Sequence, residues 1–180
     1  MTKFNDIWEV AIDAHGLITS AEARELGVSN HELVEYARRG RLEHVGHGVY
    51  RLAVRVPEGA DAYALAVKLV GPGAYLYGES VIALLDLVPT DPSRVFVATP
   101  RRVRRSLPDG IRVVRVPGGE PDTLYYGIPS QKAATAIRSA ESVVGRTRLV
   151  QAAREGRRLG YLRSAELVSL EEEYGDDEEA

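Results

Sequence analysis

The sequence predicts an α+β protein, in which a small helical unit ending in a β-hairpin precedes a larger mixed unit with a small sheet and several helices. Two capping boxes followed by a glycine-rich turn predict the first unit. Pro57-Glu58-Gly59 marks a boundary, and the Val-, Ile- and Tyr-rich runs between helical segments beyond it predict the second unit. We therefore expect domains at residues 1–56 and 60–170, followed by an acidic disordered tail at 171–180.

The composition excludes several classes of protein. The chain has 180 residues, of which 44% are hydrophobic, and no cysteine. This apolar fraction is too high for a disordered chain, and no apolar run reaches the roughly 18 residues of a membrane span. Without cysteine there is no disulfide, no thiol nucleophile and no Cys-ligated metal site. The first ten residues lack the features of a signal peptide, so we expect a cytoplasmic protein with no membrane association.

The charge is unevenly distributed. The formal charge of -3 argues at first sight against a nucleic-acid-binding protein, because affinity for phosphate comes largely from Lys and Arg. Residues 171–180, however, hold seven acids and no base, so residues 1–170 carry +4. A segment of this composition repels itself and buries no core, which predicts the disordered tail. The net charge is therefore no objection to nucleic acid as a partner.

The first 40 residues predict three short helices. Apolar residues on one face indicate a helix over Asn5–Ala14. The capping box Thr19-Ser-Ala-Glu22 starts a second helix, which ends at Leu26 because the next residue is glycine. A second capping box, Ser29-Asn-His-Glu32, starts a third helix that ends at Gly40. Helix, three-residue turn and helix is the spacing of a helix-turn-helix.

A hairpin completes this unit. Apolar residues between 42 and 52 form two short strands around Gly46-His47-Gly48, which is the size of a wing. A winged helix-turn-helix places its second helix in the major groove and its wing along the DNA backbone. Glu35 shares the outward face of that helix and repels phosphate, although a carboxylate accepts a hydrogen bond from cytosine. The alternative is a winged helix that serves as a protein-interaction module. The candidate DNA-binding residues are Ser29, Asn30, His31, Val34, Arg38, Arg39, Arg41, His44, His47 and Arg51.

The second unit combines helices with a small sheet. Asp61 is expected to cap a first helix, and Ser130 to cap a long one that reaches Val144. Strands are predicted over Arg94–Thr99, Ile111–Val116 and Thr123–Ile128. Further helices are expected at residues 79–87, 147–155 and 164–173.

An arginine cluster lies between the first two of these strands. Arg101, Arg102, Arg104 and Arg105 occur within five residues, in a segment that predicts an exposed loop. The cluster is a candidate basic surface for a phosphate backbone or an acidic partner. The alternative is a solvated hairpin loop.

No motif indicates catalysis or a metal. The four histidines lack the spacing of a metal site, and residues 71–78 lack the lysine and spacing of a phosphate-binding loop. Tyr77-Gly-Glu-Ser80 misses the nucleophile elbow. We therefore expect a protein that is not an enzyme and that needs no cofactor.

The motifs themselves resemble a known family. GLITSAEARELGVS (residues 16–29) and RRGRLEHVGHGVYR (38–51) look like the N-terminal winged helix of AbiEi-type antitoxins from type IV toxin-antitoxin systems. AYLYGES (74–80), RVFVATP (94–100) and YGIPSQK (126–132) are similar to the C-terminal antitoxin domain of that family. Glu32 and Glu35 make the predicted recognition helix less basic than is usual there.

The resemblance implies a bacterial repressor-antitoxin of abortive infection, a form of phage defence. It implies that the winged helix binds inverted repeats in its own promoter, as a homodimer or cooperatively. It also implies that the second domain counters, directly or indirectly, a nucleotidyltransferase-like toxin. The alternatives are a stand-alone winged-helix regulator whose second domain senses a partner or ligand, and an enzyme that the winged helix targets to nucleic acid.

Overall fold

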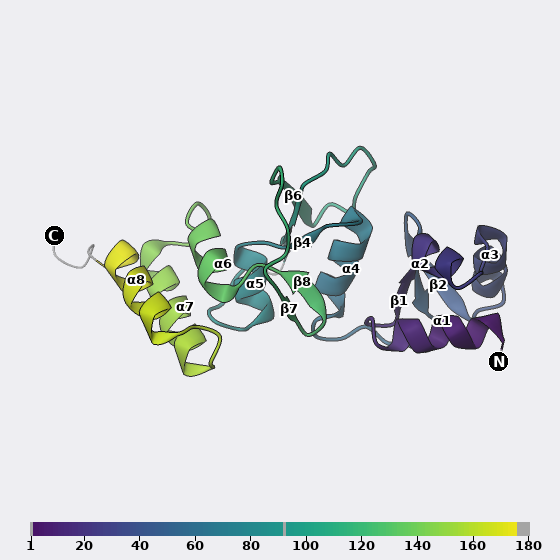
Figure 1. The fold of residues 1–180 in the computed structure, drawn as a ribbon, viewed down its shortest axis with the longest axis horizontal. Helices are drawn as coiled ribbons and strands as arrows, with labels where there is room; N and C mark the ends of the chain where they lie inside the picture. The colour runs from purple at the N-terminus through teal and green to yellow at the C-terminus, as the bar shows by residue number, and fades with distance from the viewer. Residues whose placement is uncertain (1, 92, 176–180) are drawn as a thin grey trace. The chain divides into compact units, whose positions relative to one another are not determined.

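The structure, a computed structural model, describes residues 2–91 and 93–175 and has the α+β class that the sequence predicts (Figure 1). The chain divides into two compact units, residues 1–71 and 72–180. None of the helices in the described residues is long and apolar enough to cross a membrane.

The first unit is a winged helix-turn-helix with one additional helix. Its three strands form an antiparallel sheet in the order β1-β3-β2. The hairpin predicted around Gly46-His47-Gly48 is confirmed, and a three-residue strand before the second helix, which the sequence did not indicate, adds to it. The elements are α1 (Lys3–Ile12), β1 (Leu17–Thr19), α2 (Ser20–Glu25), α3 (Asn30–Arg38), β2 (Leu42–Gly46), β3 (Val49–Leu52) and α4 (Asp61–Val70).

Both capping boxes form as predicted. Thr19 Oγ1 accepts a hydrogen bond from the Glu22 amide at 3.1 Å, and Glu22 Oε2 accepts one from the Thr19 amide at 2.8 Å. Ser29 and Glu32 repeat this arrangement at the start of α3, at 3.2 and 2.8 Å. Gly27 ends α2 with a φ of 73°, a conformation that glycine adopts without strain. These local contacts fix the turn that presents α3.

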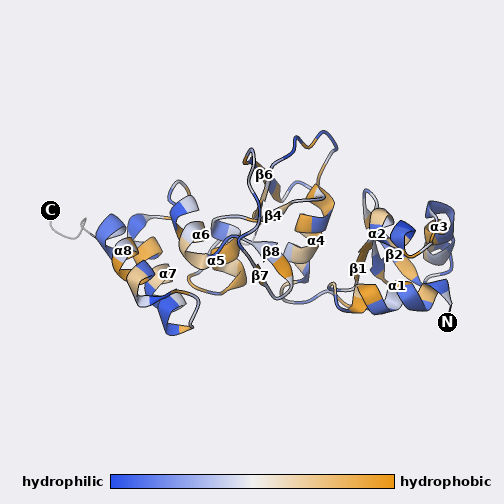
Figure 2. Cartoon of the chain, in the orientation of Figure 1, coloured by the Kyte–Doolittle hydropathy of each residue, from blue (hydrophilic) through white to orange (hydrophobic). Residues whose placement is uncertain are grey.

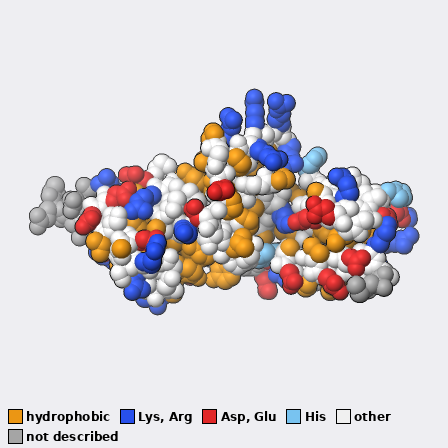
Figure 3. Space-filling model, in the orientation of Figure 1, with side chains coloured by type: hydrophobic (Ala, Val, Ile, Leu, Met, Phe, Trp, Pro, Cys, Tyr) orange, Lys and Arg blue, Asp and Glu red, His pale blue; other side chains and the backbone are white. Residues whose placement is uncertain are grey.

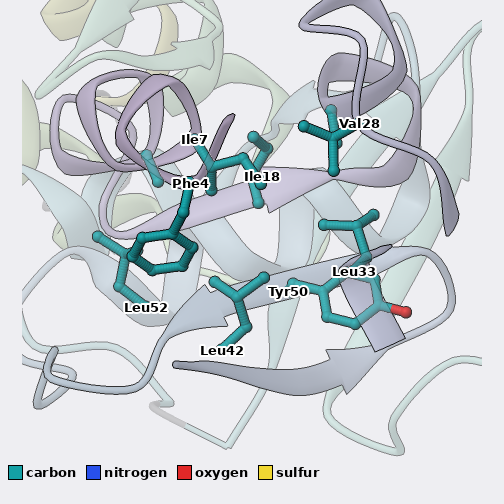
Figure 4. Close-up of a cluster of buried hydrophobic side chains, with 10 residues drawn as sticks. Phe4, Ile7, Ile18, Val28, Leu33, Leu42, Tyr50 and Leu52 are labelled. Carbon is teal, nitrogen blue, oxygen red and sulfur yellow. The ribbon is translucent and has the colours of Figure 1, made fainter. Parts of the chain in front are cut away.

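A single apolar cluster holds the winged helix together (Figure 4). Ile7 from α1, Ile18 from β1, Leu33 from α3 and Leu52 from β3 are all fully buried. Figure 2 shows the alternation of apolar and polar surface along α1 that this packing requires. Because one residue from each element meets the others here, α3 is held by its inward face and its outward face stays available.

Helix α4 is tied to the winged helix by a buried carboxylate. Asp61 accepts hydrogen bonds from Arg55 Nε and Nη2 at 3.1 and 3.0 Å, and from the Glu58 amide at 3.1 Å. His15 Nδ1 lies 2.7 Å from the same carboxylate. The sequence predicted that Asp61 caps α4, and this prediction is wrong. Ala60 occupies the N-cap position and makes no side-chain hydrogen bond there. The contacts group α4 with the first unit, whereas the sequence assigned it to the second.

In the described part of the second unit there are five strands instead of the three that were expected. Strand order is β6-β5-β4-β8-β7, with β4 parallel to β8 and β5 parallel to β6. The run 123–128 is two strands, because Tyr126 and Gly127 turn the chain with positive φ. The elements are β4 (Tyr75–Leu76), α5 (Glu79–Leu84), β5 (Val95–Thr99), β6 (Ile111–Arg115), β7 (Thr123–Tyr125), β8 (Ile128–Ser130), α6 (Ala133–Ser139), α7 (Arg146–Arg158) and α8 (Ser164–Tyr174).

Two predictions about this unit were wrong. Ser130 ends β8 instead of capping a helix, since its hydroxyl donates to the Ile128 carbonyl at 2.9 Å, and α6 ends at Ser139. The segment 100–110 is not a hairpin loop, because the two strands that it joins are parallel. It crosses from the end of β5 back to the start of β6.

The first four residues of the predicted acidic tail are helical. Residues 171–174 are the last turn of α8, in which Tyr174 is 3% exposed. Glu171 accepts from Arg154 at 2.7 Å, and Glu173 accepts from Arg138 at 2.8 Å. Leu170 and Tyr174, four residues apart, lie on one buried face of the helix, which outweighs the acidic composition. The remainder of the predicted tail, residues 176–180, lies outside the described residues.

Candidate nucleic-acid interface

The outward face of α3 presents the predicted readers. Leu33 is fully buried, which turns the opposite side of this nine-residue helix to solvent. Val34 is 53% exposed, and the other five candidates of this segment lie with it on the solvent side. All six are exposed: Ser29 and Asn30 at the N-terminal end of α3, and His31, Val34, Arg38 and Arg39 along the side that points away from Leu33.

Glu35 lies within this face and pairs with its arginines. Arg38 donates to the two carboxylate oxygens from Nε at 3.0 Å and from Nη2 at 2.9 Å. Arg39 Nη2 lies 3.7 Å from the same carboxylate. The hydrogen bonds from Arg38 lower the pKa of Glu35, and the carboxylate in turn raises the pKa of Arg38. The face therefore carries one fixed negative charge between two positive ones.

The wing residues fall into two groups. His44 and His47 lie at the surface of the wing, and the His44 ring stands 5.0 Å from the Tyr50 ring. Arg41, although exposed, places its guanidinium 3.6 Å from the centre of the Phe4 ring. The Arg51 side chain is only 16% exposed and pairs with Glu43 at 2.7 Å. As DNA contacts, Arg41 and Arg51 stay predictions, and in this structure both are engaged by the protein itself.

The histidines do not converge on a metal site. His15 lies beside Asp61, and His44 stands against Tyr50. Within residues 2–91 and 93–175, no group of three or more His, Asp or Glu side chains is placed to hold a metal ion.

Residues 1–71 and residues 72–170 differ in charge. Residues 1–71 hold eight Lys or Arg and ten Asp or Glu, a net -2. Six of those eight cations lie within ion-pair distance of a carboxylate. Residues 72–170 hold fifteen Lys or Arg and nine Asp or Glu, a net +6. The positive charge of residues 1–170 therefore lies in residues 72–170, and the seven acids of residues 171–180 bring the second unit as a whole to -1.

The arginine segment contributes most visibly to that charge. Lys and Arg side chains gather over β6 and the loop before it (Figure 3). Arg101, Arg102 and Arg104 are exposed, and no carboxylate among the described residues lies within ion-pair distance of them. A hollow of about 330 Å³ beside them has both apolar and basic side chains in its lining. It is lined by Arg101, Arg102, Val103, Arg105, Leu107, Val113 and Arg115.

The motifs of the second unit hold its sheet and helices together. The Gly78 amide donates to Gln131 Oε1 at 2.9 Å, and Gln131 Nε2 donates to Ser139 Oγ at 3.1 Å. The Phe96 amide donates to Ser80 Oγ at 2.7 Å. Residues 74–80, 94–100 and 126–132, singled out separately in the sequence, thus contact one another. The sequence did not reveal these contacts, because they depend on the pairing of β4 with β8 and β4 was not predicted.

Comparison with known proteins finds a family match over the winged helix. Residues 5–53 match the family described as "Transcriptional regulator, AbiEi antitoxin". No curated protein matches the sequence. Among solved structures, the RV2827C protein from Mycobacterium tuberculosis aligns with 92% of this chain and 78% of its own chain, at 16% identity and a TM-score of 0.40. The stretch that is similar to this family of transcriptional regulators contains α2, α3 and the wing.

Proposed function

We propose that this protein is a DNA-binding antitoxin that represses its own operon and counters a nucleotidyltransferase-like toxin encoded beside it. It acts as a binding protein and not as an enzyme. The observation that carries the proposal is the coincidence of the family match at residues 5–53 with an exposed reading face on α3.

The proposed contacts follow from the geometry of the first unit. His31 and Arg38 lie on the outward face of α3, and Asn30 is exposed at its N-terminal end, where they reach base edges when the helix enters a major groove. His44 and His47 lie on the wing beside the sugar-phosphate backbone. Inverted repeats require one winged helix per half-site, so two copies bind, as a dimer or cooperatively.

The second candidate is a stand-alone regulator whose second unit senses a partner or ligand. It is favoured by the extent of the family match, which ends at residue 53 and does not include the second unit. The basic surface of that unit would then receive the signal. The two candidates share the DNA-binding step and differ only in what the second unit does.

A binding titration tests the DNA step. Wild-type protein should bind the region upstream of its own gene more tightly than scrambled DNA of the same length in a gel-shift assay. Arg38→Ala and Arg39→Ala, on the outward face of α3, should each weaken that binding by about 1 to 3 kcal/mol if they contact bases. Unchanged affinity in both variants would contradict the proposed face.

Co-expression tests the antitoxin step. The neighbouring gene is expressed from an inducible promoter with and without this protein, and growth is followed. Rescue by the wild-type chain supports the antitoxin. Repression of the promoter without any rescue would leave the stand-alone regulator as the function.

A further inference from the structure

The pairing of Glu35 with Arg38 leaves a defined set of donors unused. A guanidinium carries five N–H groups in a plane, and the contact to Glu35 takes the side formed by Nε and Nη2. Both hydrogens of Nη1 and the second hydrogen of Nη2 remain. No described residue lies within hydrogen-bond distance of Nη1, and the Arg38 side chain is 71% exposed. The end of the fork is therefore free and points away from the carboxylate.

The N–H donors at this end of the guanidinium fit the acceptors of one base, guanine. Guanine presents two adjacent acceptors, N7 and O6, in the major groove, and a bidentate arginine is the commonest specific contact to them. Adenine and cytosine place an amino donor at this edge, which an arginine cannot use. The position of Arg38 on the outward face of α3 is the one from which a recognition helix reads bases.

The Glu35 carboxylate holds the Arg38 side chain in a fixed orientation, which an exposed arginine otherwise lacks. A free arginine side chain loses rotamer entropy when it is fixed against a base. Two hydrogen bonds to Glu35 fix the plane of the guanidinium before DNA arrives. Glu35 is held in turn by its place one helical turn before Arg38, with 28% of its side chain exposed. A positioning role explains why a residue that repels phosphate stands in the centre of a DNA-binding face.

We propose that Glu35 positions Arg38 to read a guanine in each half-site of the operator. The inference rests on the proposed function, because it requires that α3 enters the major groove. It goes further by assigning the base, the reading residue and the residue that positions it. The repulsion between Glu35 and the backbone lowers affinity for DNA in general, so the pair exchanges non-specific affinity for sequence preference.

The test replaces one acceptor atom at a time. Footprinting first locates the half-sites, and each guanine in them is then replaced by 7-deazaguanine, which keeps its base pairing but lacks N7. Binding of the full chain is measured by fluorescence anisotropy. At one guanine per half-site the wild-type chain should lose about 5- to 150-fold in affinity, as expected for a bidentate contact. Arg38→Ala should bind more weakly overall and show no further loss at that guanine.

Three variants separate positioning from charge. Arg38→Lys keeps the charge but lacks the fork, so it should keep the salt dependence of binding and lose the preference for that guanine. Glu35→Gln should bind scrambled DNA more tightly, while its penalty at the modified guanine falls. Glu25→Gln makes the same change in charge on exposed α2 without touching Arg38, and its penalty should equal that of the wild type.

Two results would overturn the inference. A 7-deazaguanine penalty that is as large in Arg38→Ala as in the wild type, at every guanine, removes Arg38 as the reader. A Glu35→Gln variant with the full wild-type penalty removes Glu35 as the positioning residue. A wild-type chain that prefers no DNA sequence at all would overturn the proposed function as well, and that result is distinct from both.

Discussion

Neighbouring residues on α3 have opposite roles, and their substitution should have opposite consequences. Leu33 is fully buried in the core of the winged helix, whereas Val34 is 53% exposed. Leu33→Ala should lower the free energy of unfolding of the first unit by about 2 to 5 kcal/mol, because it leaves a cavity. Val34→Ala should change it by no more than about 0.5 kcal/mol. Denaturant titration followed by the fluorescence of Trp8, the single tryptophan, measures both.

Glu32 should make the first unit sensitive to acid. Hydrogen bonds from Lys3 and from Ser29 lower its pKa from 4.5 to about 2. Because the pKa is lower in the folded state than in the unfolded state, unfolding takes up a proton below pH 4.5. The stabilisation is complete above that pH and is lost as the pH falls toward 2.

The comparison of Glu32→Gln with the wild type checks this expectation. The decrease in unfolding free energy between about pH 7 and about pH 3, a range that crosses the unfolded-state pKa of a glutamate, should be smaller in the variant, again by Trp8 fluorescence. An equal decrease in both proteins would show that other carboxylates govern the acid response.

At this scale the sequence predicted local contacts and missed distant ones. Thr19 with Glu22, and Ser29 with Glu32, are three residues apart, so the rules of helix capping find them. Asp61 with His15 bridges 46 residues, and no local rule indicates that pair. The pair of Glu35 and Arg38 is an intermediate case. The sequence shows that the two residues are close on one helix, but it does not show which donors of Arg38 the carboxylate takes.

Among the elements, the crossover between β5 and β6 carries a charge that should be measurable. Simultaneous Arg→Ala substitution at 101, 102, 104 and 105 should weaken binding to DNA of any sequence. It should also reduce the slope of log affinity against log salt, by about 0.9 for each phosphate that the variant no longer neutralises. Titration of wild type and variant over a range of salt concentrations gives the slope.

Paired arginines provide the matched control for this experiment. Arg138, Arg154, Arg158 and Arg163 each lie within ion-pair distance of a glutamate in the second unit. Their fourfold substitution by alanine changes the net charge equally. If the slope falls by the same amount in both variants, total charge governs binding and the crossover is not a contact surface.

Element prediction found the helices of the second unit but misjudged the ends of some, and it missed the shortest strand. Helix α7 extends over thirteen residues with a continuous apolar face, and the sequence indicated it. Strand β4 has two residues and is defined only by its neighbours β5 and β8, so no pattern within it distinguishes it from a connector. Residues 171–173 were given both to a helix over 164–173 and to the acidic tail, and the helix holds, because Leu170 and Tyr174 pack at helical spacing.

On the scale of the whole molecule, truncation should separate two effects of the acidic end. A variant that ends at Gly175 lacks four acids but keeps Tyr174, and it should bind non-specific DNA more tightly at low salt. A variant that ends at Leu170 lacks seven acids and the buried Tyr174, so its second unit should also unfold more readily. Anisotropy at two salt concentrations and thermal unfolding distinguish them. Equal DNA affinity in the first variant and the wild type would leave the acidic end without influence on binding.

The location of the basic surface could not be predicted from the sequence, although its existence could. Counting charges gave +4 for residues 1–170. It did not show that most cations of the first unit, such as Lys3 and Arg55, are paired with carboxylates of the same unit. Pairing depends on which side chains the fold brings together, and that information is absent from a count.

The order of strands in the second sheet has a consequence for synthesis on the ribosome. Its central pair joins β4 at residue 76 to β8 at residue 130, so the sheet cannot close until both have left the exit tunnel. The core of the winged helix lies entirely within residues 4–52 and is complete much earlier. A nascent or prematurely terminated chain therefore has a folded winged helix before it has a second unit. Such fragments would occupy an operator without the properties of the whole protein.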